Sequence, residues 1–121
     1  MDIEHLAEEI ECVGKSEQRE LASRMAVLLA HLLKWQYQPA RQCKNWQHTI
    51  RTQRKEVSYV LKEAPSLHTK FRDEPWTEIV WDKAKSQVEN ETGMDIDTFP
   101  ETCPWNIADV LKEGWLPGES L

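Results

Sequence analysis

One apolar segment, residues 16–35, constrains the fold of this chain more than any other part of the sequence. Its apolar residues recur at intervals of three and four, which is the period of an α-helix. They form two adjacent seams, so the helix presents a wide apolar face and should pack against more than one neighbour. The first seam contains Leu21, Met25, Leu28, Leu32 and Trp35, and the second contains Ala22, Ala26, Leu29 and Leu33.

A second amphipathic segment follows a connection at Pro39, which ends the first helix. We expect a helix from about Arg41 or Cys43 to Glu63 that folds back on segment 16–35 to form a hairpin. Its inner row is mainly apolar, and its outer row is basic along the whole helix. The inner row is Trp46, Ile50, Gln53, Val57, Val60 and Ala64, and the outer row is Lys44, His48, Arg51, Lys55, Ser58 and Lys62.

The N-terminal segment is predicted to be a separate helix. Ile3–Cys12 has helical spacing, Gly14 is a plausible stop, and Ser16 can cap the helix that follows. Further along the chain we expect a turn after Pro65, a helix over residues 76–91, a short helix over residues 105–113 and an apolar tail that docks on the bundle.

No segment alternates with the period of a β-strand. The sequence therefore predicts a single all-α domain spanning residues 1–121. Its architecture should be a small antiparallel helical bundle with a central helical hairpin and two short accessory helices.

The net charge of -6 is unevenly distributed along the chain. Residues 1–13 contain five carboxylates and no Lys or Arg, and residues 89–121 contain eight carboxylates and one Lys, so the middle is net basic. Either the acidic ends fold back on the basic centre, or part of that centre stays uncovered and meets an anionic partner.

The three cysteines, Cys12, Cys43 and Cys103, are widely spaced and odd in number, which favours free thiols in a reducing compartment. Met1 leads directly into acidic residues, so no secretory signal is expected. The longest apolar run is too short to cross a bilayer. We therefore expect a cytoplasmic protein without a membrane partner.

The sequence contains the motifs HLAEEIE (5–11), LAHLLKWQYQP (29–39), Trp46 with TIRTQR (49–54), ETG (91–93) and FPETCPW (99–105). Together they resemble the DUF29 family, a bacterial and largely cyanobacterial domain of unknown function. The resemblance covers nearly the whole chain and implies an all-helical fold with no assigned reaction. Members usually have a further helix, rich in aromatic and acidic residues, before the position that matches Asp2. This chain is either a short member or part of a longer protein, and in both cases an apolar groove could be left uncovered for a partner chain to fill.

Two candidate sites lie on the predicted helix 43–63. Its basic row, with Arg51 and Lys55 at the centre, could contact phosphates or could be an ordinary solvated face. The amide of Gln53, in an otherwise apolar row, needs a hydrogen-bond partner. It either makes a structural hydrogen bond or forms a polar pocket for an anionic ligand with Arg54 and His31.

Two further candidates involve segment 16–35. His31, Lys34, Trp35 and Trp46 are either an aromatic cluster with a polar rim or a recognition patch for a peptide or partner helix. His5, Glu8 and Glu9, with His31 facing them, have the ligand types of a bundle metal centre, but a surface ion-pair network is the simpler interpretation. We assign no metal ligand, no cofactor and no catalytic residue.

No phosphate-binding glycine loop, nucleophile elbow or zinc signature is found. The preferred hypothesis is a non-catalytic helical module that binds another protein or a second copy of itself. The alternatives are binding of nucleic acid or another anionic ligand by the basic row, and a metal- or ligand-dependent enzyme with its site between the first three helices.

Overall fold

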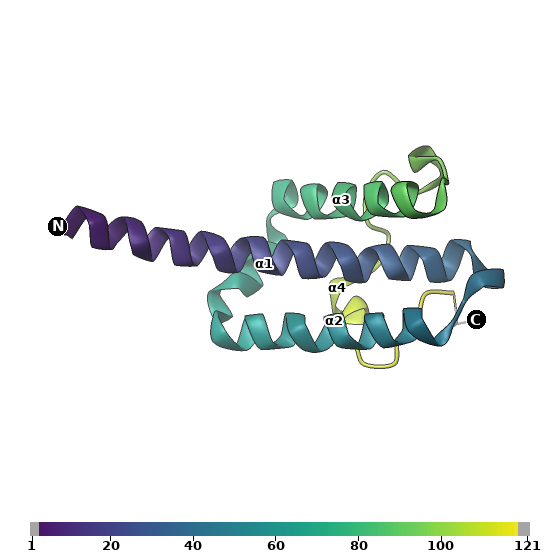
Figure 1. Ribbon diagram of the computed structural model, residues 1–121, viewed down its shortest axis with the longest axis horizontal. Coiled ribbons are helices and arrows are strands. Elements are labelled where there is room, and N and C mark those ends of the chain that lie inside the picture. Colours follow the sequence, from purple (N-terminus) through teal and green to yellow (C-terminus); the bar gives the residue numbers. More distant parts are fainter. Residues whose placement is uncertain (1–2, 119–121) are drawn as a thin grey trace.

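The computed structural model describes the backbone of residues 3–118 and the side chains of residues 15–118. Its three long helices are α1 (Ile3–Tyr37), α2 (Lys44–Glu63) and α3 (Glu74–Thr92). Helix α1 lies between the other two, α2 runs back along it, and α3 runs in the same direction as α1 (Figure 1). The all-α class and the central α1–α2 hairpin are confirmed.

The connections are short helical turns. Between α1 and α2 lies η1 (Pro39–Arg41), and between α2 and α3 lies η2 (Pro65–Arg72). After α3 the chain forms η3 (Ile96–Thr98) and then α4 (Ile107–Val110). In the described part of the chain, no helix combines the length and the apolar character needed to cross a membrane.

Gly14 does not end a helix, and the predicted division into helices 3–12 and 16–35 is wrong. Residues 3–37 form one helix, in which Ser16 is an interior residue and not a cap. A glycine inside a helix costs only about 1 kcal/mol relative to alanine, which is not enough to stop a helix supported on its C-terminal side. The acidic N-terminal segment therefore extends α1 past the ends of α2 and α3 and does not fold back on them (Figure 1).

The core is built around α1, as its two seams predicted. Both seams are buried, and Leu21, Leu28, Leu32 and Leu33 are fully inaccessible to solvent. Helix α2 covers one side with Ile50, Val57, Val60 and Leu61, and α3 covers the other with Val80, Trp81, Ala84 and Val88.

The two faces of α2 also follow the predicted pattern. Ile50, Val57 and Val60 are buried, whereas Trp46, Gln53 and Ala64 are partly buried. The outer row, Lys44, His48, Arg51, Lys55, Ser58 and Lys62, is exposed throughout.

The last predicted helix is shorter than expected, with four residues in place of nine. The side chain of Asn106 accepts a hydrogen bond from the backbone N–H of Ala108 at 2.8 Å, which starts the helix after Asn106 and not at Trp105. Gly114 adopts φ 84° and turns the chain beyond it. The apolar tail docks as predicted, because Pro117 is buried and the Trp115 ring packs edge-on against Trp105.

Candidate functional site

A groove of about 610 Å³ runs between α2 and the C-terminal segment, and we call it the α2 groove. Its volume lies in the range of ligand-binding clefts. Two elements far apart in the sequence form its walls, so it exists only in the folded chain. Helix α2 contributes Gln47, Ile50, Arg51, Arg54, Lys55 and Ser58, and the C-terminal segment contributes Leu111, Glu113, Gly114 and Leu116.

Arg54 holds the two walls of this groove together. Its side chain is buried, its Nε donates to the carbonyl oxygen of Val110 at 2.9 Å, and its Nη2 donates to the carbonyl oxygen of Trp115. A guanidinium suits this position because its planar fork carries several donors in a fixed geometry. The two hydrogen bonds fix the C-terminal segment against α2.

Part of the Arg54 guanidinium is not used by these two hydrogen bonds. Only two of its five N–H donors are used in these two bonds, and Nη1 has no acceptor among the described residues. Burial lowers the pKa of Arg54, and the negative charge of Glu113 opposes that shift. The group stays protonated at any physiological pH, so the wall of the groove carries a permanent positive charge.

The groove is amphipathic. Its charged residues are Arg51, Arg54, Lys55 and Glu113, so its net charge is +2. Among the ion pairs between described residues, none includes Arg51 or Lys55. The apolar part of the lining comes from Ile50, Leu111 and Leu116. Such a surface suits an anionic partner that also carries apolar groups.

The predicted patch around Lys34 is a junction between helices. Lys34 of α1 pairs with Glu91 of α3, and its Nζ lies 5.8 Å from the centroid of the Trp46 ring of α2. Lys34 and Trp35 are both buried, and Trp46 is partly buried. The structure thus brings Lys34 and Trp46 together, but it leaves little of Lys34 or Trp35 for a partner to contact.

His31, Gln53 and Arg54 do not form the polar pocket that we considered. His31 donates from Nδ1 to the carbonyl oxygen of Val27 at 2.9 Å, and the charges of Lys34 and Glu91 act on it, so it lies on the α3 side. Arg54 is directed to the C-terminal segment. The side-chain oxygen of Gln53 is buried without a hydrogen-bond partner in the described part of the chain.

The metal-site hypothesis falls largely outside the described side chains, since His5, Glu8 and Glu9 belong to residues 1–14. Within residues 15–118, no group of three or more His, Cys, Asp or Glu side chains gathers as a metal site would require.

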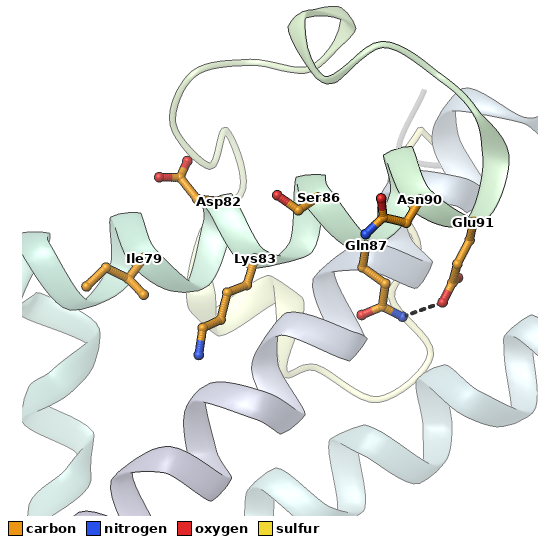
Figure 2. A pocket seen from close by; sticks show the side chains of 7 residues that line it. All are labelled: Ile79, Asp82, Lys83, Ser86, Gln87, Asn90 and Glu91. Atoms are coloured by element: carbon orange, nitrogen blue, oxygen red, sulfur yellow. Dashed lines mark hydrogen bonds between the residues drawn. The ribbon is translucent and has the colours of Figure 1, made fainter.

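A second hollow, of about 520 Å³, lies along the outer side of α3, and Figure 2 shows the side chains that line it. All seven residues come from α3, from Ile79 to Glu91, and the Gln87 amide donates to Glu91 at 3.1 Å (Figure 2). Because one helix supplies the whole lining, this hollow is a helix surface and not a cleft between elements. The α2 groove is therefore the stronger candidate site.

The sequence indicated one wall of the α2 groove and missed the other. Arg51, Arg54 and Lys55 were candidates from their positions on the basic helix. Leu111, Glu113 and Leu116 were not, although the predicted docking of the apolar tail was a signal that this segment would cover part of the bundle.

Comparison with known proteins places the chain in a family. Neither the curated proteins nor the solved structures contain a significant match to it. The family model described as "Domain of unknown function DUF29" matches residues 1–116, which is nearly the whole chain, including both walls of the α2 groove. The chain therefore belongs to the DUF29 family.

Proposed function

We propose that this DUF29 protein is a non-catalytic interaction module whose α2 groove binds an acidic, amphipathic segment of a partner protein. One observation carries the proposal: a groove between two elements combines an apolar lining with three cations and a single carboxylate.

The dimensions of the groove favour a polypeptide segment over a small anion. The lining residues of α2 extend from Gln47 to Ser58, which corresponds to about 17 Å along the helix axis. An amphipathic helix of about three turns has this length and can place apolar side chains at i, i+3, i+4 and i+7 in such a groove.

The two kinds of lining residue have different roles in binding. Burial of the partner's apolar side chains against Leu111 and Leu116 supplies most of the affinity. The exposed cations Arg51 and Lys55 attract acidic residues, which raises the association rate and selects against basic partners. Arg54 keeps the two walls in place before the partner arrives, so less ordering is needed on binding.

A direct binding measurement tests this function. The probe is a fluorescein-labelled helical peptide with leucine and glutamate at amphipathic spacing, titrated with the protein and followed by fluorescence polarisation. The variant Arg51→Glu with Lys55→Glu should raise Kd at least about tenfold, because both rim cations become carboxylates.

The chain offers a matched control for that variant. Lys44→Glu with Lys62→Glu makes the same charge change on the same exposed row, but outside the groove. It should leave Kd within about threefold of the wild-type value, since long-range effects of exposed charges are screened by salt. Equal losses in both variants, or no binding of the peptide to the wild-type protein, would refute the proposal.

Nucleic-acid binding is a second candidate, supported by the continuous exposure of the basic row on α2. Phosphates along this row would contact cations inside and outside the groove alike. The same two double variants separate the candidates, because a phosphate-binding row loses affinity for a labelled duplex in both and shows a steep salt dependence.

We also infer a cytoplasmic location, which the wide spacing of the three cysteines supports. Mass spectrometry after rapid alkylation of cells tests it: Cys43, which is exposed, should be found as a free thiol.

A further inference from the structure

We propose that the acidic segment that fills the α2 groove is the N-terminal part of α1 from a second copy of this chain, so that the protein forms a reciprocal dimer. This inference rests on the proposed function of the groove and names its partner. We call residues 3–13, which form the N-terminal end of α1, the acidic arm.

The acidic arm extends beyond the rest of the bundle. Helix α1 has 35 residues and α2 has 20, which correspond to about 52 Å and 30 Å along their axes. Figure 1 shows the N-terminal end of α1 continuing past the ends of both α2 and α3. The first buried side chain of the described part of α1 is Leu21. The backbone of the arm is thus held away from the helices of its own chain.

The sequence of the arm is complementary to the groove in charge and in apolar spacing. Ile3, Leu6, Ile10 and Val13 recur at intervals of three, four and three, the spacing of residues along one side of a helix. The arm contains four carboxylates, Glu4, Glu8, Glu9 and Glu11, and no Lys or Arg occurs before Lys15. The arm is therefore an acidic amphipathic helix, whereas the groove is cationic with an apolar lining.

The arm and the groove also agree in length. Residues 3–13 span about 15 Å along α1, and the groove spans about 17 Å along α2.

The arm of the same chain cannot enter the groove while α1 is continuous. Trp46, next to the start of the groove, lies against Lys34, which is about 47 Å along the α1 axis from Ile3. Toward its N-terminal end, α1 runs past α2 and then beyond it (Figure 1). The groove is thus available to an arm from another copy.

Pairing of one arm with another arm is disfavoured by charge. Each arm carries four carboxylates without a compensating Lys or Arg, so two arms side by side would repel each other. An arm in a groove instead joins opposite charges. In a symmetric dimer each copy gives one arm and receives one, so the same contact forms twice.

A charge-swap experiment tests the dimer on the full-length chain. The arm variant is Glu8→Lys with Glu9→Lys, and the groove variant is Arg51→Glu with Lys55→Glu. In sedimentation velocity, the wild-type protein should be a dimer and each variant alone a monomer, because each variant sets like charges against each other. An equimolar mixture of the two should form a heterodimer, since the basic arm meets the acidic groove and the acidic arm meets the basic groove.

The variant Lys44→Glu with Lys62→Glu is the matched control and should remain dimeric. A free peptide with residues 2–14 of this chain should dissociate the wild-type dimer and should bind the arm variant, whose groove is intact. Circular dichroism should show the same helical content in all variants, which establishes that loss of the dimer is not loss of the fold.

The outcomes separate this inference from the proposed function. A wild-type monomer that still binds the leucine–glutamate peptide in its groove overturns the dimer and leaves the proposed function standing. A monomer that binds no acidic peptide overturns both. A dimer that persists in both charge variants uses another surface and also overturns the inference.

Discussion

Lys34 and Glu91 form an ion pair across the α1–α3 contact in which the two partners differ in exposure. The Lys34 side chain is 8% exposed, and the Glu91 side chain is 44% exposed. Removal of Lys34 therefore leaves an unpaired carboxylate that water can solvate. Removal of Glu91 leaves an unpaired ammonium group that water largely cannot reach.

We expect Glu91→Gln to be more destabilising than Lys34→Met. The first variant leaves the buried ammonium group without its counter-charge, at a cost of about 1–3 kcal/mol after allowance for the partial exposure of Glu91. The second keeps an unbranched apolar side chain beside Trp46 and should cost less than about 1 kcal/mol. Urea unfolding followed by tryptophan fluorescence measures both, and the reverse order would contradict this account of the pair.

Acid should destabilise the fold in two separate pH ranges. Burial lowers the pKa of His31, so the unfolded chain binds its proton more readily, and stability should fall as pH decreases below about 6.5. Burial alone would raise the pKa of Glu91, but the hydrogen bond and charge of Lys34 outweigh it and lower that pKa. The contribution of Glu91 is therefore present above about pH 4.5 and is lost as pH falls through its lower folded-state value.

The variants His31→Gln and Glu91→Gln assign these two ranges. The free energy of unfolding is measured from pH 8 to pH 3. The decrease in stability below about pH 6.5 should be absent in His31→Gln, and the decrease below about pH 4.5 should be absent in Glu91→Gln. A His31→Gln profile that still falls between pH 6.5 and 5 in the wild-type manner would rule out the assignment to His31.

Replacement of Arg54 should loosen the C-terminal segment as well as lower the global stability. Arg54→Met leaves the carbonyl groups of Val110 and Trp115 without their donor, and hydrogen bonds to a charged group contribute about 1.5–3 kcal/mol. Arg54→Lys keeps the charge but not the fork, so it should recover only part of the loss.

Amide hydrogen exchange separates the local effect of Arg54 from the global one. The backbone N–H of Trp115 donates to the Lys112 carbonyl. Relative to the wild-type protein, Arg54→Met should increase its exchange rate more than it increases the exchange rates of amides in the α1 core. An exchange rate at Trp115 that follows the global unfolding rate alone would show that Arg54 does not anchor the segment.

Two glycine-to-alanine variants should differ in their effect on stability, because of the two glycines only Gly93 has a positive φ angle. Gly93 ends α3 with φ 79°, and a Cβ there would meet no atom within 4 Å, so Gly93→Ala should cost about 1 kcal/mol from backbone strain alone. Gly14 lies inside α1, so Gly14→Ala should increase helicity and be neutral or stabilising by up to about 1 kcal/mol. Circular dichroism and thermal unfolding measure both; a loss of helicity in Gly14→Ala would contradict a continuous α1.

Periodicity predicted the parts of this fold that depend on one helix face at a time. The outer row of α2, from Lys44 to Lys62, is exposed because a regular helix keeps residues at this spacing on one side. The prediction that Gly14 ends a helix was wrong, because the free-energy cost of one interior glycine is smaller than the cooperative stabilisation of a long helix.

Arg54 shows why the site was harder to predict than the fold. Its partners are backbone carbonyls of Val110 and Trp115, which lie 56 and 61 residues away along the chain. Because every residue has a backbone carbonyl group, the sequence does not indicate which carbonyl accepts a given hydrogen bond. The second wall of the groove is set by tertiary packing, which no local sequence pattern encodes.

The continuity of α1 through Gly14 has a geometric consequence. An α-helix advances 1.5 Å and rotates by about 100° per residue, so the number of residues between Gly14 and Leu21 sets the angular phase of the acidic arm relative to the core. One inserted residue would swing the arm by more than a quarter of a circle, whereas seven would return it almost to its starting phase. An insertion or deletion in this stretch would therefore change the direction in which each side of the acidic arm faces relative to the core.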